Sequence, residues 1–290
     1  MDTITHTLFG LAIYGAIDKS GLSKQERRAY LITAVGASQI PDIDVISKLW
    51  DQEGLYQMWH RGITHSVFLT PVWAGLFLLL SRLLFKTGGG KLFLIAWAAV
   101  LIHNTSDLFN AWGTGYLEPF STMRVTFGTI PIVDLVFWVI IGGAFIAARK
   151  NRTKAPRYFR GAWVLIGLHV LLQSTQGYIL YQQYSQEYDQ VALSAEFVPW
   201  TFSVITKSDD TVSIYGDGLF KAKEKLISLT SAEDADLEQL FSKRPEAKTL
   251  YEWSPFVVVV NDDTRIGIYD PRFYRNGQSF LFEYIEKTQR

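Results

Sequence analysis

The sequence predicts an α-helical multi-span membrane domain followed by a small soluble α+β domain that is mainly antiparallel β. Three observations lead to this prediction. The chain has 290 residues, of which 48% are hydrophobic and 14% aromatic, and its mean hydropathy is +0.10, which suggests a mixture of membrane and soluble parts. Nearly all long apolar runs precede Tyr181, whereas nearly all acidic runs follow it. We therefore expect a membrane domain over residues 1–184 and a soluble domain over residues 185–290.

Long apolar runs define the expected membrane spans. Residues 67–85 are long enough to cross a hydrocarbon core of ~30 Å at ~1.5 Å per residue, with Arg82 near one end where it can snorkel. Three runs of similar character, flanked by Lys, Arg, Trp or Tyr as interface anchors, are residues 91–102, 130–148 and 160–181.

Two shorter apolar runs, residues 4–17 and 29–40, are expected to be tilted, shallow or re-entrant. The first has Asp2 before it and neither a preceding basic residue nor a suitably placed cleavage site, so we expect it to be retained and not removed as a signal peptide.

Basic residues predict the topology, because Lys and Arg accumulate in short cytoplasmic loops. If all six runs cross the membrane, one set of alternate loops carries most basic residues: Lys19, Lys24, Arg27, Arg28, Arg82, Lys86, Lys91, Arg149, Lys150, Arg152, Lys154, Arg157 and Arg160. The other set has only Lys48, Arg61 and Arg124. A multi-pass protein of the cell membrane is expected, with its soluble tail outside the cytoplasm.

The tail shows strand patterns. Runs of β-branched and aromatic residues lie between turn signals at residues 197–206, 211–215, 256–261, 265–269 and 280–285. The turn at residues 261–263 predicts a hairpin. One helix is expected over residues 231–242, with Ser231 as its N-cap and Glu233 and Asp234 in its first turn.

Composition limits the chemistry. The 28 Lys and Arg residues balance the 28 Asp and Glu residues, so no nucleic-acid partner is expected from bulk charge. The chain has no cysteine, which leaves His, Asp and Glu as metal-binding side chains.

Histidines and carboxylates gather on the side predicted to be external. His103 and Asp107 are four residues apart and share a helical face, which Asn110 continues. His60 and His65 are five apart, and a turn at Gly62 would direct both into one site. The candidate metal ligands are His6, Asp42, Asp44, His60, His65, His103 and Asp107. Asp2, four residues before His6, could bind the metal or orient its imidazole.

Each of these motifs could also serve the fold alone and bind no metal. The Pro41-Asp42-Ile43-Asp44 motif could be a loop or helix cap, and His169, within an apolar run and without a charged neighbour, is expected to be a packed core residue. Seven ligands from four segments nevertheless indicate a functional site, because charged groups near a bilayer are costly. One or two divalent ions are expected, with zinc first and manganese or magnesium as alternatives.

These motifs resemble the membrane-bound, metal-dependent hydrolase family, also described as LexA-binding, inner-membrane-associated hydrolases. The similarity rests on Asp2-Thr3-Ile4-Thr5-His6 with Gly10, on the motifs at residues 41–44, 60–66 and 103–107, and on Gly113-Thr114 and Pro119. It covers residues 1–181. The resemblance implies a multi-span membrane protein with a metal-dependent hydrolase assignment, and it carries the metal over to the seven ligands named above.

Hydrolysis is the natural use of such a site, since a metal among His and carboxylate ligands activates water and stabilises charge on an acyl or phosphoryl oxygen. Arg61 suits an anionic substrate, with headgroup anchoring as its alternative role. The candidate catalytic residues are Arg61, Asp44 and Asn110. We expect a membrane-embedded hydrolase that acts on an ester or phosphoester of a lipid or lipid-linked substrate at the outer membrane surface. The alternative is a non-catalytic membrane protein with a structural metal and a tail that binds a partner protein.

Overall fold

The structure is a computed structural model, and it describes residues 1–287. These residues form two compact units. The helical unit consists of Met1–Asp44 and Arg61–Ser174, and the β-rich unit consists of Val45–His60 and the chain from Thr175 onward.

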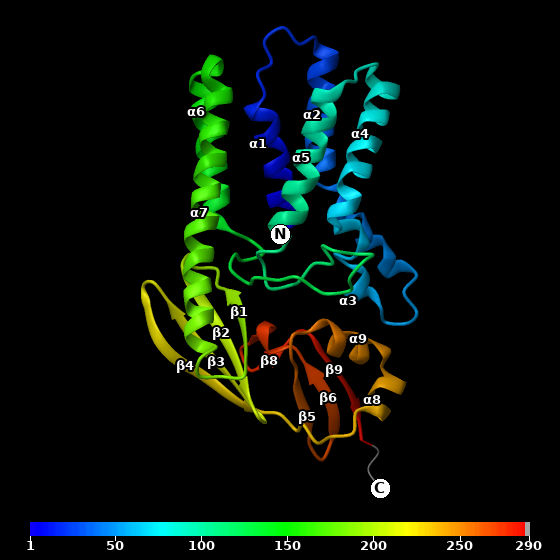
Figure 1. The fold of residues 1–290 in the computed structure, drawn as a ribbon, viewed down its shortest axis with the longest axis vertical. Helices are drawn as coiled ribbons and strands as arrows, with labels where there is room; N and C mark the ends of the chain where they lie inside the picture. Colours follow the sequence, from blue (N-terminus) through cyan, green and yellow to red (C-terminus); the bar gives the residue numbers. More distant parts are fainter. Residues whose placement is uncertain (288–290) are drawn as a thin grey trace. The chain divides into compact units, whose positions relative to one another are not determined.

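The helical unit is a bundle whose long helices run side by side (Figure 1). Its α-helices are α1 (Thr3–Ala16), α2 (Lys24–Ala37), α4 (Thr70–Phe85), α5 (Gly90–Asp107), α6 (Leu135–Lys150) and the first part of α7 (Ala155–Tyr184). Short 3₁₀ segments connect them: η1 (Ile40–Leu49), which continues into the other unit, η2 (Ile63–His65), η3 (Val67–Leu69) and η4 (Arg152–Lys154).

Capping residues explain where these helices begin. Asp2 accepts hydrogen bonds from the backbone N–H groups of Ile4 and Thr5 at the start of α1, and Asp134 caps α6 in the same way. Ser23 and Glu26 form a capping box at the start of α2. Glycine then sets the spacing of α1 and α2, because a Cβ at Gly10 would lie 2.7 Å from the Cα of Val35.

The expectation of a multi-span membrane domain is wrong. Among the described residues, two helical stretches are long and apolar enough to cross a membrane: Val67–Phe85 and Arg152–Tyr184. At ~1.5 Å per residue, the 14 residues of α1 and the 16 of α6 fall short of a ~30 Å core. α2 begins with several charged residues, and the last turns of α5 carry His103, Asn104 and Asp107, so neither supplies an uninterrupted apolar span.

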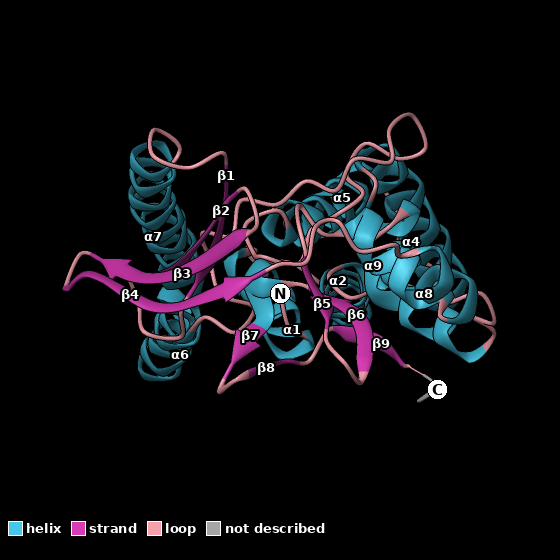
Figure 2. Cartoon of the chain, turned by 90° about the horizontal axis from the view of Figure 1, so that it is seen from below, coloured by secondary structure: helices cyan, strands magenta, loops and turns pink. Residues whose placement is uncertain are grey.

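The β-rich unit contains three antiparallel sheets. A four-stranded sheet has the order β1 (Gln190–Ala195), β2 (Thr201–Ser208), β3 (Thr211–Gly218) and β4 (Lys221–Thr230). A second sheet pairs β5 (Val258–Asn261), β6 (Arg265–Tyr269) and β9 (Phe282–Glu286), and a third pairs β7 (Tyr274–Arg275) with β8 (Gln278–Ser279). Helices α3 (Tyr56–Trp59), α8 (Glu238–Lys243) and α9 (Pro245–Trp253) and the 3₁₀ segment η5 (Pro271–Phe273) also belong to the unit. Figure 2 shows α8 and α9 in cyan and the strands in magenta.

The four-stranded sheet is covered on both faces. Val204 of β2 packs in one cluster with Leu180 and Tyr184 of α7, while the next residue, Ile205, packs with Val258 of β5 on the opposite face. Side chains alternate across a strand, so burial of both faces makes the middle of β2 continuously buried. The last turns of α7 are thereby part of the β-rich unit.

Most strand predictions for the tail are confirmed, since the five expected runs overlap β2, β3, β5, β6 and β9. The predicted helix over residues 231–242 is misplaced. Ser231 does not cap a helix; its hydroxyl accepts a hydrogen bond from the N–H of Val259, and helical structure begins only at Glu238. His169 is a buried core residue, as expected, but it does have a charged neighbour: its Nε2 lies 2.9 Å from Oδ2 of the buried Asp134.

Candidate metal centre

The last turns of α5 supply two donors. His103 and Asp107 lie one helical turn apart and are both almost fully buried. Their shared face is the one that the spacing predicted. His103 approaches Asp107 with 3.7 Å between its Nε2 and the carboxylate Oδ2.

Two irregular segments bring the other donors. Asp42 lies in the first turn of η1, which begins three residues after α2 ends, and His65 ends the short η2. The chain reaches η2 through Arg61, whose φ of 57° lies in the left-handed region. The backbone N–H of Arg61 donates to Asp44, which ties the start of this segment to η1.

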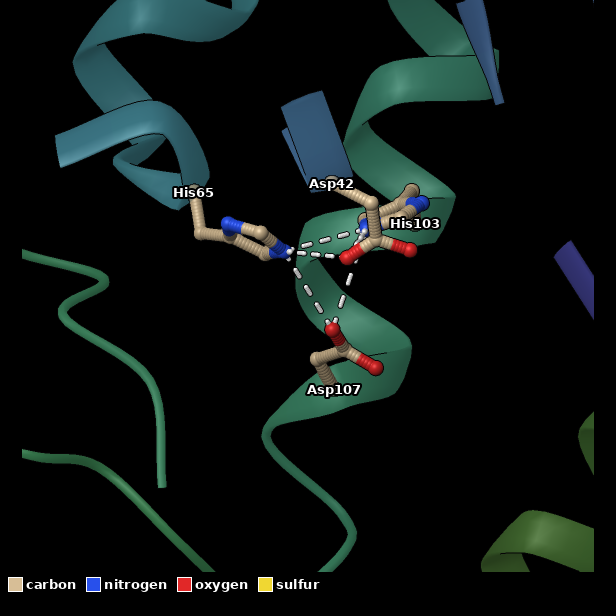
Figure 3. A group of neighbouring side chains, drawn as sticks. All are labelled: Asp42, His65, His103 and Asp107. Carbon is tan, nitrogen blue, oxygen red and sulfur yellow. Dashed lines mark hydrogen bonds and ion pairs between the residues drawn. The ribbon is translucent and has the colours of Figure 1, made fainter. Parts of the chain in front are cut away.

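Side chains from these segments and α5 converge on one point (Figure 3). His65 Nε2 lies 3.4 Å from Asp42 Oδ1, 3.5 Å from Asp107 Oδ2 and 3.1 Å from His103 Nε2. His103 Nε2 lies 3.6 Å from Asp42 Oδ1. We call Asp42, His65, His103 and Asp107 the four-residue group.

The spacing within the four-residue group fits one tetrahedral ion. Bonds of ~2.0–2.1 Å to a tetrahedral metal place neighbouring ligand atoms about 3.3–3.4 Å apart. Five of the six ligand-atom distances within the group lie between 3.1 and 3.7 Å, and all six are within 4.8 Å. A regular octahedral ion with the same bond lengths would place adjacent ligands closer, at about 2.9–3.0 Å.

Hydrogen bonds on the far side of each imidazole orient it toward the centre. His103 Nδ1 donates to the carbonyl oxygen of Ser38 at 2.7 Å, which leaves Nε2 as the nitrogen facing the group. His65 Nδ1 lies 3.2 Å from Asp44 Oδ2, and that oxygen also accepts a hydrogen bond from the hydroxyl of Thr64. Asp44 therefore supports His65 from behind.

Asp107 is held from several directions. Its Oδ2 lies 3.3 Å from Nε of Arg61, and its Oδ1 lies 3.4 Å from Nε2 of His6 and contacts the buried amino group of Met1. Arg61 also donates to the side chain of Asn110 and to the carbonyl oxygen of Met1. A carboxylate fixed in this way keeps Oδ2 directed at the centre.

In the metal-free chain, the surroundings shift the pKa values of His65 and His6 in opposite directions. Burial alone would lower the pKa of His65, but contacts with Asp107, Asp42 and Asp44 outweigh it and raise the pKa to about 10. Burial, reinforced by His103, lowers the pKa of His6 to about 3. The carboxyl pKa of Asp42 is well below its usual range, because hydrogen bonds from His103 and His65 outweigh its burial.

The structure gathers most of the predicted ligands. Four form the group itself, His6 stacks on His103, and Asp44 lies behind His65. His60 is not a member: it belongs to the β-rich unit, where its ring stacks on Tyr56. Asp2 caps α1. The catalytic roles assigned to Arg61, Asp44 and Asn110 stay predictions.

Two charged residues near the group were missed by sequence reasoning. Glu118 is half-buried, and its backbone carbonyl accepts a hydrogen bond from Ser66, the neighbour of His65. Arg124 pairs with Glu118 at 3.6 Å and donates to the carbonyl oxygen of Arg61. Both lie in the long loop after α5, where no local periodicity marks them.

Comparison with known proteins agrees with part of the expected resemblance. The model of the YdjM inner membrane protein family matches residues 1–180. The chain is 28% identical over 218 residues to the uncharacterized protein YfhP of Bacillus subtilis (strain 168). The match covers 71% of this chain and 65% of YfhP, which is slightly less than two thirds of the length of YfhP. No solved structure matches significantly. The expected membrane-associated family is thus confirmed and, with the two apolar helices, indicates membrane localisation; hydrolase activity stays a prediction.

Proposed function

Because the chain belongs to the YdjM inner membrane protein family, we propose that it is a membrane-associated, metal-dependent hydrolase of an ester or phosphoester in a lipid or other amphiphilic substrate. The observation that carries the proposal is the four-residue group, in which two imidazoles and two carboxylates converge with tetrahedral spacing. Mixed nitrogen and oxygen ligands in this geometry favour zinc, with manganese or magnesium as alternatives.

The chain's own residues would hold and tune the ion. A divalent ion bound here would polarise a substrate oxygen and promote the ionisation of water. Ser38 and Asp44 fix which imidazole nitrogens face it, and Arg61 holds the carboxylate of Asp107. The guanidinium of Arg61 is itself buried against Asp107 and Asn110, so we assign it a positioning role.

Glu118 is the residue we propose for proton transfer. Its backbone is tied to Ser66 beside the group, its side chain is half-buried, and burial raises the pKa of its carboxyl group. The paired Arg124 would present a positive charge to an anionic substrate. Both assignments rest on links to the segment that carries His65: the backbone of Glu118 accepts a hydrogen bond from Ser66, and Arg124 donates to the carbonyl oxygen of Arg61.

A cavity in the helical unit supports an amphiphilic substrate. It has a volume of 440 Å³ and is lined mainly by apolar side chains, including Phe9, Phe137 and Ile166. Thr105 and Ser106 line it from α5, whose neighbouring face carries His103 and Asp107. A hydrocarbon chain could therefore lie beside the helix that also bears the metal donors.

The basic residues support an extracytoplasmic tail. Arg82 and Lys86 lie at the C-terminal end of one candidate span, and several basic residues between Arg149 and Arg160 lie at the N-terminal end of the other. If these ends face the cytoplasm, Val67 and Tyr184 mark the external ends, and the β-rich tail follows on that side.

One observation favours a second function. All four donors come from the protein and three of them are fully buried, as in a closed structural site that leaves no position for substrate. On this alternative the metal stabilises the helical unit, and the tail binds a partner protein.

The two functions are separated by an assay of the purified, metal-loaded protein in mixed micelles. Phospholipids and lipid-linked phosphates serve as substrates, and released headgroup or phosphate is measured. Turnover by the wild type that is absent in His65→Ala supports the hydrolase. Full metal content without turnover of any substrate in the panel supports the structural site.

A further inference from the structure

Two neighbouring loops of the four-stranded sheet form an apolar tip. One is the connection between β1 and β2, where Phe197 and Val198 are 59% and 63% exposed. The other is the tight turn between β3 and β4, where Leu219 and Phe220 are 64% and 78% exposed. Exposed apolar side chains gathered in this way usually mark an interaction site.

The two loops are locked together. The N–H of Leu219 donates to the carbonyl oxygen of Trp200 at 3.0 Å, and the Trp200 and Phe220 rings meet edge to face. A Cβ at Gly218 would lie only 2.4 Å from the Trp200 oxygen, so glycine allows this close approach. The tip is therefore one surface and not two independent loops.

The tip is attached to a candidate membrane span. The side chain of Gln176 in α7 donates to the same carbonyl oxygen of Trp200 at 3.0 Å. Gln176 lies eight residues before Tyr184, where the candidate span ends. At ~1.5 Å per residue, this is about 12 Å along the helix axis. The tip thus lies beside the span, within the stretch of α7 that the bilayer and its headgroups would cover.

The surrounding residues fit a membrane interface. Tyr178 and Tyr181 are exposed on α7 close to Gln176, and aromatic residues of this kind concentrate at the boundary between hydrocarbon and headgroups. Strand β4 leaves the tip with Lys221 and the exposed Lys225, whose ammonium groups could meet anionic headgroups, while Lys223 between them pairs with Glu187 at 3.2 Å.

We propose that the tip formed by Phe197, Val198, Leu219 and Phe220 inserts into the interface of the lipid bilayer and anchors the β-rich unit there. The occupant of this surface is the membrane itself. The proposal is independent of metal binding and of hydrolysis, because neither the four-residue group nor its neighbours take part.

The absence of native cysteine permits a direct test in the full-length protein. Two single-cysteine variants, Val198→Cys on one loop and Phe220→Cys on the other, are each labelled with a nitroxide. The labelled proteins are reconstituted in vesicles that contain phosphatidylglycerol. Asp263→Cys, in the exposed turn between β5 and β6, is the matched control. Collisions with dissolved oxygen, which concentrates in lipid, and with a water-soluble nickel chelate are measured at each site.

Insertion raises oxygen collisions at the tip and lowers nickel collisions about tenfold or more relative to residue 263, because the polar chelate is excluded from the lipid. Replacing Leu219 and Phe220 by Ser should restore nickel collisions at residue 198. Nickel collisions equal to those at residue 263 would place the tip in water, and low collisions with both reagents would mean cover by protein; either result overturns the proposal.

Discussion

The imidazole rings of His6 and His103 stack with 3.6 Å between their centroids and 18° between their planes. Helix α1 therefore supports a metal donor of α5, although His6 is not itself part of the four-residue group. The carbonyl oxygen of Ser38, the C-cap of α2, accepts a hydrogen bond from Nδ1 of His103. The ring is therefore held by α1 and by the end of α2 before any metal binds.

This stacking leads to the first prediction. His6→Phe retains an aromatic ring against His103, so the protein should still hold one ion per chain, whereas His6→Ala should weaken metal affinity about 10- to 100-fold, as loss of a supporting contact does. Metal content by mass spectrometry and titration with zinc measure both. A fall from two ions to one in His6→Phe would instead make His6 a ligand of a second ion.

The second prediction concerns the donors. His65→Ala and Asp107→Ala each remove a ligand atom from the four-residue group, so the purified variants should contain far less metal than the wild type. His60→Ala is the matched control, because His60 belongs to the same sequence motif but stacks on Tyr56. Equal metal content in the wild type and both ligand variants would eliminate the site, and metal loss in His60→Ala would show that the group is incomplete.

Proton release is the third prediction. In the metal-free chain the pKa of His65 is raised to about 10, above its usual value near 6.5, so the imidazole still carries its proton at pH 7. Metal binding needs a neutral imidazole and must displace this proton. Calorimetric titrations in buffers of different ionisation enthalpy should give about one proton released per ion at pH 7.

The sign of the pH dependence follows. Protons compete with the metal below the raised pKa, so apparent affinity should increase about tenfold per pH unit between pH 6 and 8, where one proton is displaced. His65→Ala, with any residual metal, should lose this dependence. An affinity that is flat over this range would show that His65 is already neutral in the free protein.

Local patterns predicted the site better than they predicted the membrane topology. The interval between His103 and Asp107 indicates a shared helical face, and that face is the one the fold uses. The proposed turn at Gly62 was expected to bring His60 and His65 together, but the left-handed residue is Arg61, and only His65 reaches the group. Such a backbone reversal depends on distant contacts, here Asp44 with the N–H of Arg61.

Strand β4 and Glu118 show what sequence patterns cannot supply. The charged Lys221–Thr230 segment has no apolar alternation at its start, and it is held as an edge strand by its pairing with β3. Glu118 lies near the group only because a loop after α5 returns to Ser66. The shortness of residues 4–17 and 29–40 was visible in the sequence, but the apolar runs at residues 91–102 and 130–148 did not show that α5 is too polar at one end, and α6 too short, to supply an uninterrupted apolar span.

The fourth prediction concerns sidedness. Basic residues cluster between Arg149 and Arg160, which favours a cytoplasmic location for that end of the candidate span, and the β-rich tail then lies outside. In the cysteine-free chain, an impermeant maleimide should label Ser208→Cys in whole cells but not Thr153→Cys. Disruption of the cells should expose the second site to labelling. Labelling of Thr153→Cys alone in intact cells would invert the orientation.

The fifth prediction separates chemistry from metal binding. Glu118 contacts Ser66, the neighbour of His65, through its backbone and does not belong to the group, so Glu118→Gln should keep full metal content and fold normally. If Glu118 transfers a proton, turnover of a lipid ester or phosphoester should fall about 10²- to 10⁴-fold, the usual contribution of such a group. Metal analysis and released headgroup are measured on the same preparation.

Arg124→Gln provides the control for this prediction, because it removes the ion-pair partner of Glu118 and leaves the carboxyl group. Burial already raises the pKa of Glu118, and loss of the nearby cation should raise it further, so the acidic limb of the pH–rate profile should move to higher pH. In Glu118→Gln that limb should disappear. A Glu118→Gln protein with unchanged turnover and an unchanged profile would exclude this residue from the chemistry while leaving the four-residue group intact.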